Sequence, residues 1–329
     1  MKKISPKQRD LIFCAILIVS LFSGLVVDNK FYLDILITST YYSIIAVAWN
    51  IMCGYTGQLS LGHGAFLGIG QYTSVLLYTK LGLTPWLGVF AGGVMAMLLA
   101  FLIGVLVLRL KGPFFALSTI ALCTILQILA VKFTDLTGGA SGITIRFDPA
   151  LVNIIFRSYK IYFTIFVILL LVVLVTTIRV RHSRLGSNLI AIRENDLAAS
   201  SLGINLFKNQ VIALIISAFF TSVAGCFYAQ YVLFIYPEGA FDIIISQKAA
   251  ILSIVGGAGT VFGPAIGGFV LTPTEIMLRT WLGSTYQGAY LIVYGVLLIF
   301  VILVIPNGVI GTIAQYFLHR RSLRVEKLS

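Results

Sequence analysis

Two glycine-rich segments contain the polar side chains of this chain that are best suited to binding chemistry. The first, Asn50–Ser74, lies where two apolar runs meet, and it has six glycines. Irregular backbone at membrane depth survives only where protein or water satisfies it, and polar breaks of this kind tend to mark a solute path. Pure helix packing through glycine is the alternative. From this segment we expect the following residues to line a translocation path: Asn50, Gln58, Ser60, Gly62 and His63. For His63 taken alone, a hydrogen-bonded packing role is favoured over a proton relay.

The second segment, Ser253–Gly268, resembles the first in composition. It also has six glycines, and Pro264 interrupts its short apolar run. Paired Gly/Pro-interrupted segments in two halves of a transporter indicate an internal repeat with the path between them. We therefore expect its backbone to face the path at Gly256, Gly257, Gly259 and Gly263, and we treat an internal repeat as one interpretation of the pair.

A third segment, Ser183–Asn209, is polar at both ends and reads as helical. Glu194, Ala198, Ala199 and Gly203 form an E-x3-A-A-x3-G core. Small side chains followed by glycine suit a short helix that lies close against a partner and then turns. The alternative, an amphipathic connector resting on the membrane surface, needs a cleaner apolar stripe than this one.

The elements that position these segments are membrane-spanning helices. Of the 329 residues, 59% are hydrophobic and only 10% are charged, whereas a soluble domain carries about 25% charged residues. We predict an all-α polytopic membrane protein with about ten spans (8–10), some of them broken or short. It forms one domain over 1–329, with a cytoplasmic loop at about 179–209. The expected spans are 11–27, 35–53, 65–79, 86–108, 114–131, 161–178, 210–234, 247–257, 265–280 and 288–305.

The distribution of charge predicts the topology. With both termini in the cytoplasm, the cytoplasmic segments hold fifteen Lys and Arg against four Asp and Glu, and the other side holds eight against seven. Lys and Arg accumulate on the cytoplasmic side, so the net charge of +12 reflects membrane orientation and not nucleic-acid binding.

Motifs for independent chemistry are missing from the sequence. It has no G-x4-G-K-[ST] phosphate loop, H-E-x-x-H or G-x-S-x-G, and its four cysteines lack metal-ligand spacing. Glu275 and Arg279, four residues apart, could pair with each other. We expect neither catalytic residues nor a metal, and an energy source in another subunit. A self-contained secondary carrier and an intramembrane enzyme are the competing hypotheses.

Five motifs in the family's order resemble the LivM-type permeases of branched-chain amino-acid ABC importers. They are G-Y-T-G-Q-L-S-L-G-H-G-A-F (54–66), K-G-P-F-F-A-L-S-T (111–119), T-G-G-A-S-G (137–142), A-I-R-E-N-D-L-A-A-S-S-L-G (191–203) and the glycine-rich run Ile254–Gly268. Gly64 and Phe114 depart from the residues that the family commonly has there. The fourth motif is similar to the loop that importer permeases dock into an ATPase.

That resemblance implies a heteromeric importer in the bacterial cytoplasmic membrane. A second homologous permease would share the path, two cytosolic ABC ATPases would bind ATP and Mg, and an extracytoplasmic binding protein would deliver leucine, isoleucine or valine. No cofactor is expected in this chain. Arg193 would join Glu194, Ala198, Ala199 and Gly203 in the coupling helix. Urea, amides or other amino acids are alternative substrates, since relatives of the family carry them.

Overall fold

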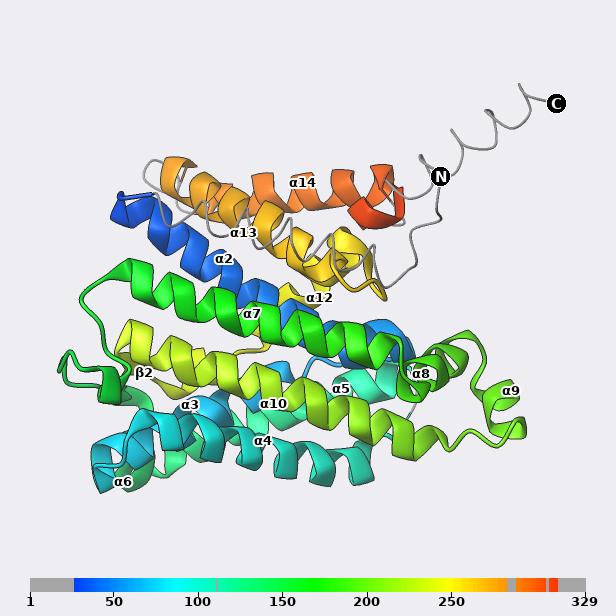
Figure 1. The fold of residues 1–329 in the computed structure, drawn as a ribbon, viewed down its shortest axis with the longest axis horizontal. Coiled ribbons are helices and arrows are strands. Elements are labelled where there is room, and N and C mark those ends of the chain that lie inside the picture. Colours follow the sequence, from blue (N-terminus) through cyan, green and yellow to red (C-terminus); the bar gives the residue numbers. More distant parts are fainter. Residues whose placement is uncertain (1–26, 111, 283–287, 306–307, 313–329) are drawn as a thin grey trace.

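The described part of the chain is a bundle of long helices. The structure is a computed structural model that describes residues 27–110, 112–282, 288–305 and 308–312. Most long helices follow the long axis of the molecule (Figure 1). They are α2 (Lys30–Trp49), α3 (His63–Leu81), α4 (Pro85–Val107), α5 (Pro113–Lys132), α7 (Tyr159–Arg181), α10 (Leu206–Val232), α12 (Ile243–Gly257), α13 (Gly263–Leu282) and α14 (Ala289–Val304).

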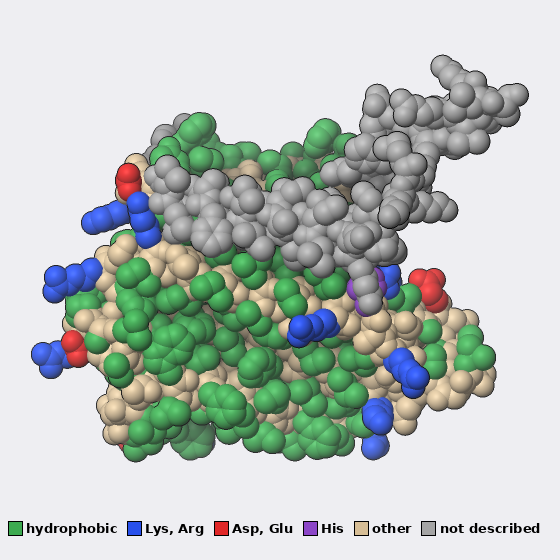
Figure 2. Space-filling model, viewed as in Figure 1, with side chains coloured by type: hydrophobic (Ala, Val, Ile, Leu, Met, Phe, Trp, Pro, Cys, Tyr) green, Lys and Arg blue, Asp and Glu red, His purple; other side chains and the backbone are tan. Residues whose placement is uncertain are grey.

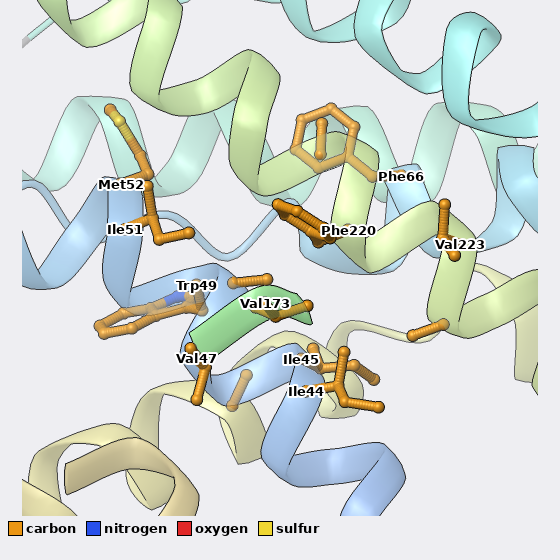
Figure 3. Close-up of a cluster of buried hydrophobic side chains, with 14 of the residues drawn as sticks. Ile44, Ile45, Val47, Trp49, Ile51, Met52, Phe66, Val173, Phe220 and Val223 are labelled. Atoms are coloured by element: carbon orange, nitrogen blue, oxygen red, sulfur yellow. The ribbon is translucent and has the colours of Figure 1, made fainter. Parts of the chain in front are cut away.

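Helices α2 and α10 form the centre of the bundle. Helix α2 packs against α7, α12 and α13, and α10 packs against α3 and α4. The core between them is aliphatic and aromatic, and Figure 3 shows part of it, with Val47 of α2, Ile51 of the turn after α2 and Phe220 of α10 among its side chains. Close van der Waals packing of such side chains holds membrane helices together, because leaving lipid gives an apolar side chain little free energy. The centre is therefore packed with side chains.

The outer helices present apolar side chains to their surroundings. Seven helical stretches are long and apolar enough to cross a membrane: 30–54, 85–107, 113–132, 159–181, 206–232, 237–256 and 289–312, the last running over residues that are not described. Figure 2 shows hydrophobic side chains across the middle of one face, with most charged side chains toward the ends of the long axis. A hydrocarbon layer fits this belt, since lipid does not penalise exposed apolar surface.

Short elements close the two ends of the bundle. At one end lie α6 (Thr134–Thr137), the turn η3 (Gly139–Ser141) and an antiparallel pair of β1 (Ile143–Thr144) with β2 (Phe234–Ile235). The turn η4 (Leu151–Asn153) and α11 (Pro237–Ala240) complete the connections. Helices α8 (Arg184–Glu194) and α9 (Asp196–Ser201) project at the opposite end (Figure 1).

The helix positions agree with the predicted spans, apart from two qualifications. The expected span 11–27 lies almost entirely outside the described residues. Helices α3 and α13 match expected spans in position, but they are not among the seven apolar candidates. The loop at 179–209 contains two short helices, α8 and α9, where the sequence predicted one helical segment. Asn195 adopts an extended conformation (φ −160°, ψ 111°) and ends α8.

Candidate functional site

Asn50 joins the two glycine-rich segments. It opens a π-helical turn, η2 (Asn50–Gly54), that continues α2, and its side chain is fully buried. The side-chain Nδ2 donates to the carbonyl of Thr260 at 2.8 Å, and Oδ1 accepts from the amide of Gly259 at 2.7 Å. One amide side chain thus satisfies a donor and an acceptor of irregular backbone more than 200 residues away, which backbone at membrane depth requires.

Gly54 makes room for this contact. A Cβ built at Gly54 would overlap the Asn50 amide and would lie 2.9 Å from the Gly259 nitrogen. The wider π turn brings the carboxyl end of the helix beside the second segment. Turns of this type occur frequently at functional sites.

The returning segment, residues 57–62, is held by side chains from neighbouring helices. Trp49 Nε1 donates to the Ser60 carbonyl at 2.8 Å, and Thr119 Oγ1 of α5 accepts from the amide of Leu61 at 3.0 Å. Ser60 Oγ accepts from the amide of Gly62 at 3.3 Å. Ser60 is buried, whereas Gln58 is half-buried and Leu59 is exposed. The segment is therefore tied to α2 and α5 and keeps one side open.

His63 begins α3 and is fully buried. Its Nε2 lies 2.7 Å from Ser217 Oγ of α10, and the Ser217 hydroxyl donates to the Ala48 carbonyl at 2.6 Å. Because that hydroxyl has only one proton, Nε2 of His63 must be the donor in this chain of bonds. The arrangement links α2, α3 and α10, as the packing interpretation of His63 predicts.

Arg193, at the end of α8, points toward both segments. Its Nη1 donates to the Gly54 carbonyl at 2.8 Å. A Cβ at Gly57 would lie 3.1 Å from Arg193 Cγ, and a Cβ at Gly259 would overlap Nη1. Gly57 and Gly259 both have positive φ, 74° and 79°, so glycine suits both the backbone and the space. We call Asn50, Gly54, Gly57, Arg193, Gly259 and Thr260 the junction.

The remaining glycines of the second segment pack helix against helix. A Cβ at Gly256 would overlap the Gly263 carbonyl, and one at Gly263 would overlap the Gly257 carbonyl. Helices α12 and α13 can approach this closely only without side chains at these positions. At Gly256 and Gly263 the geometry accords with the packing alternative.

Three N-caps shape the projecting loop. Ser183 Oγ accepts from the Gly186 amide at 3.4 Å, Asn195 Oδ1 from the Ala198 amide at 3.0 Å, and Asn205 Oδ1 from the Lys208 amide at 2.9 Å. These residues begin α8, α9 and α10, because a side-chain oxygen supplies an acceptor that the first helical turn lacks. The loop is thus a defined helix–turn–helix.

The two alanines of this loop differ in their surroundings. Ala199 is 2% exposed, whereas Ala198 and Gly203 are exposed. On the same short helix Leu197 is 71% exposed, and Leu202, just after it, is 81% exposed. Large apolar side chains this exposed, on a loop rich in charged and polar residues, are typical of a protein contact surface.

Glu275 pairs with a residue that the sequence spacing did not indicate. Its Oε2 lies 2.7 Å from Lys248 Nζ of α12, and that ammonium also sits 3.8 Å from the centre of the Tyr42 ring. The ion pair that Glu275 makes therefore joins α12 to α13, in place of an Arg279 partner one turn along its own helix.

The structure brings together many of the residues predicted for the path. Asn50 and Gly259 are in direct contact, Ser60 is bonded to Trp49 next to Asn50, Gly62 lies against Thr119, and His63 bonds to Ser217. Sequence reasoning missed Ser217, Thr119 and Thr260, which satisfy polar groups of the predicted residues. The sequence signal that could have identified them is an isolated hydroxyl residue within an apolar run.

A family model matches residues 31–302, and its description is branched-chain amino acid transport system / permease component. Over 271 residues the chain is 32% identical to the high-affinity branched-chain amino acid transport system permease protein LivM of Escherichia coli K12. That match covers 75% of this chain and 63% of the relative, so the chain spans less than two thirds of that protein.

Two further relatives come from Salmonella typhimurium LT2. The permease protein LivM is 30% identical over 300 residues, which cover 84% of this chain and 70% of the relative. The permease protein LivH is 29% identical over 292 residues, which cover 82% of this chain and 91% of the relative. No solved structure matches the chain.

Proposed function

The chain belongs to the family of branched-chain amino acid transport permeases, and on this premise we propose that it is the membrane subunit of an ABC importer for leucine, isoleucine and valine. In this role it forms part of the translocation path and leaves ATP hydrolysis to other subunits. Its membrane character follows from the apolar helices and from the family to which it belongs.

The exposed surface of α9 supports coupling to an ATPase most directly. Leu197 and Leu202 are 71% and 81% exposed, and they lie on a projection at one end of the bundle (Figure 1). Arg179, Arg181 and Arg184 accompany the projection, as expected of a cytoplasmic end. We assign Glu194, Ala198 and Gly203 to the docking surface, with Ala199 supporting it from the buried side.

The proposed topology has ten spans in one domain, with both termini in the cytoplasm of a bacterial cell. The helices α2, α3, α4, α5, α7, α10, α12, α13 and α14 supply nine of them, and the segment 11–27 supplies the first. Two helix–break–helix units, α2 to α3 and α12 to α13, support an internal repeat, and their breaks meet at Asn50.

The path is proposed to run beside residues 57–62. Leu59 is exposed on the open side of this segment, and Gln58 beside it is half-buried, with a buried Oε1 that has no hydrogen-bond partner among the described residues. An amino-acid zwitterion needs polar partners, because a charge at mid-membrane costs at least about 2.5–3.5 kcal/mol. The amide of Gln58 offers both a donor and an acceptor, while Ser60, Gly62 and His63 hold the segment in place.

The partners proposed are a second homologous permease, two cytosolic ATPases that bind ATP and Mg, and an extracytoplasmic binding protein. This chain itself carries no cofactor in the proposal. Loose side-chain selection by the permease is sufficient, since the binding protein chooses the substrate before delivery.

Co-purification with the cognate ATPases tests the docking surface. Leu197→Asp with Leu202→Asp should abolish capture of the ATPases, because two charges replace the apolar contact. Leu151→Asp with Val152→Asp, at two exposed positions of the turn η4 outside the apolar spans, is the matched control and should leave capture intact. Equal capture by both proteins would contradict docking through α9.

The ligand of the cognate binding protein separates the substrate alternatives. Leucine, isoleucine or valine bound with micromolar or tighter affinity would support the proposal. If the binding protein instead binds urea, an amide or an unrelated amino acid, the alternative substrate class is supported.

A further inference from the structure

Arg193 differs from the other basic residues of the projecting loop. Its guanidinium reaches back to the bundle and donates to the Gly54 carbonyl at 2.8 Å. Arg193, Arg184 and Lys208 are all exposed residues, but within the described ranges the side chains of Arg184 and Lys208 make no hydrogen bond or ion pair. A charge that served only the membrane orientation of the loop would not need such a contact.

The contact surface of Arg193 includes both glycine-rich segments. On one side are the carbonyl of Gly54 and the space beside Gly57, and on the other is Gly259. The Asn50 amide fastens the same two segments together through Gly259 and Thr260. The loop, the end of α2 and the α12–α13 break are therefore joined by a continuous set of hydrogen bonds and close contacts.

The residue types fit a mechanical connection. Guanidinium is planar and directs its donors in a fixed fork, so it transmits position better than a flexible ammonium. Hydrogen bonds from charged groups are stronger than those between neutral groups. Glycine at 57 and 259 lets the Arg193 side chain lie directly against backbone. Any movement of α8 along its axis must then displace the Gly54 carbonyl or break this bond.

We propose that Arg193 is a positioning residue that transmits movement of the coupling loop to both broken helices at the junction. The proposal rests on the proposed function, because it assumes that an ATPase moves α8 and α9. It differs from a docking role, in which Arg193 would bind the ATPase. Arg193 acts inward, and the α9 surface acts outward.

The test uses the complete importer, reconstituted in liposomes with its ATPases and binding protein, and compares Arg193→Met with Arg184→Met. Both variants remove one positive charge from α8. We expect Arg193→Met to lower labelled-leucine uptake per ATP hydrolysed by about tenfold, the factor that corresponds to about 1.4 kcal/mol. Capture of the ATPases should be unchanged in both variants, and Arg184→Met should transport as the unmodified importer does.

A second substitution keeps the idea testable if uptake falls for an unrelated reason. Gly259→Ala places a methyl group against Nη1 and should also uncouple uptake from hydrolysis. In the Arg193→Met background it should add less than it does alone, because the overlap with the guanidinium is gone, while the cost of alanine at a φ of 79° and beside the Gly54 carbonyl is the same in both backgrounds.

Each outcome is decisive. The proposal is wrong if Gly259→Ala lowers uptake per ATP as much in the Arg193→Met background as it does alone. It is also wrong if Arg193→Met alone shows normal uptake per ATP. Loss of ATPase capture by Arg193→Met would assign the residue to docking instead. An unmodified importer without ATP-dependent uptake would count against the proposed function, whatever the variants did.

Discussion

Replacing Gly54 by alanine tests the geometry of the junction. The new methyl group would overlap the Asn50 amide and crowd the Gly259 nitrogen at 2.9 Å. Asn50 must then rotate away and lose its bonds to Gly259 and Thr260, of 2.7 and 2.8 Å. Two neutral hydrogen bonds contribute roughly 1 kcal/mol each, and buried groups left unpaired cost roughly 1–3 kcal/mol more. The expected loss is about 3–5 kcal/mol.

Thermal unfolding in detergent, followed by intrinsic fluorescence, measures this loss. At about 2–4 °C per kcal/mol the midpoint should fall by roughly 6–20 °C. Gly295→Ala in α14 is the matched control, because a Cβ there meets nothing within 4 Å. Its midpoint should be unchanged or slightly higher, since alanine favours a helix more than glycine does.

The double substitution Asn50→Ala with Gly54→Ala checks the cause. Once the amide is removed, the methyl group at 54 has much less to displace, so the double variant should unfold close to Asn50→Ala alone. The reasoning fails if Gly54→Ala is as stable as Gly295→Ala, or if the two junction substitutions destabilise additively.

Three further predictions concern other parts of the chain. A cysteine at the exposed Ser187 should react with a membrane-impermeant thiol reagent only in inverted vesicles or opened cells, and labelling of intact cells would reverse the topology. Ala199→Trp should reduce the yield of folded protein because Ala199 is buried, whereas Ala198→Trp should fold normally and weaken ATPase capture; equal yields would refute this distinction. Lys248→Met should destabilise the protein by about 3–5 kcal/mol by leaving Glu275 unpaired, and adding Glu275→Gln should restore much of the lost thermal stability; an unchanged midpoint in Lys248→Met would contradict a structural ion pair.

The positions of the helices were predictable because long apolar runs in this chain end at glycine, proline or charged residues. Thus the expected spans 86–108 and 114–131 lie within one residue of α4 and α5 at each end. The polar and glycine composition of the two segments also identified the regions that meet at Asn50. Hydropathy and composition are local properties, so they can be read from sequence.

The contacts that define the junction were not predictable in this way. Asn50 and Thr260 are 210 residues apart, and Arg193 is 139 residues from Gly54. Such pairs depend on how helices pack, which neither spacing nor composition encodes. The same reason explains why Glu275 was matched with Arg279 and not with Lys248, and why Arg193 was assigned only to the ATPase side. The break at Asn195 carried a local signal, an N-cap residue before Asp196.

Uptake of labelled leucine by the importer in sealed liposomes tests the proposed function most directly. Leucine should accumulate only when ATP is on the side of the ATPases and the binding protein is on the other side. This chain reconstituted alone should transport nothing, with or without an ion gradient. Leucine accumulation by the chain alone in response to an ion gradient would contradict the account and identify a self-contained carrier.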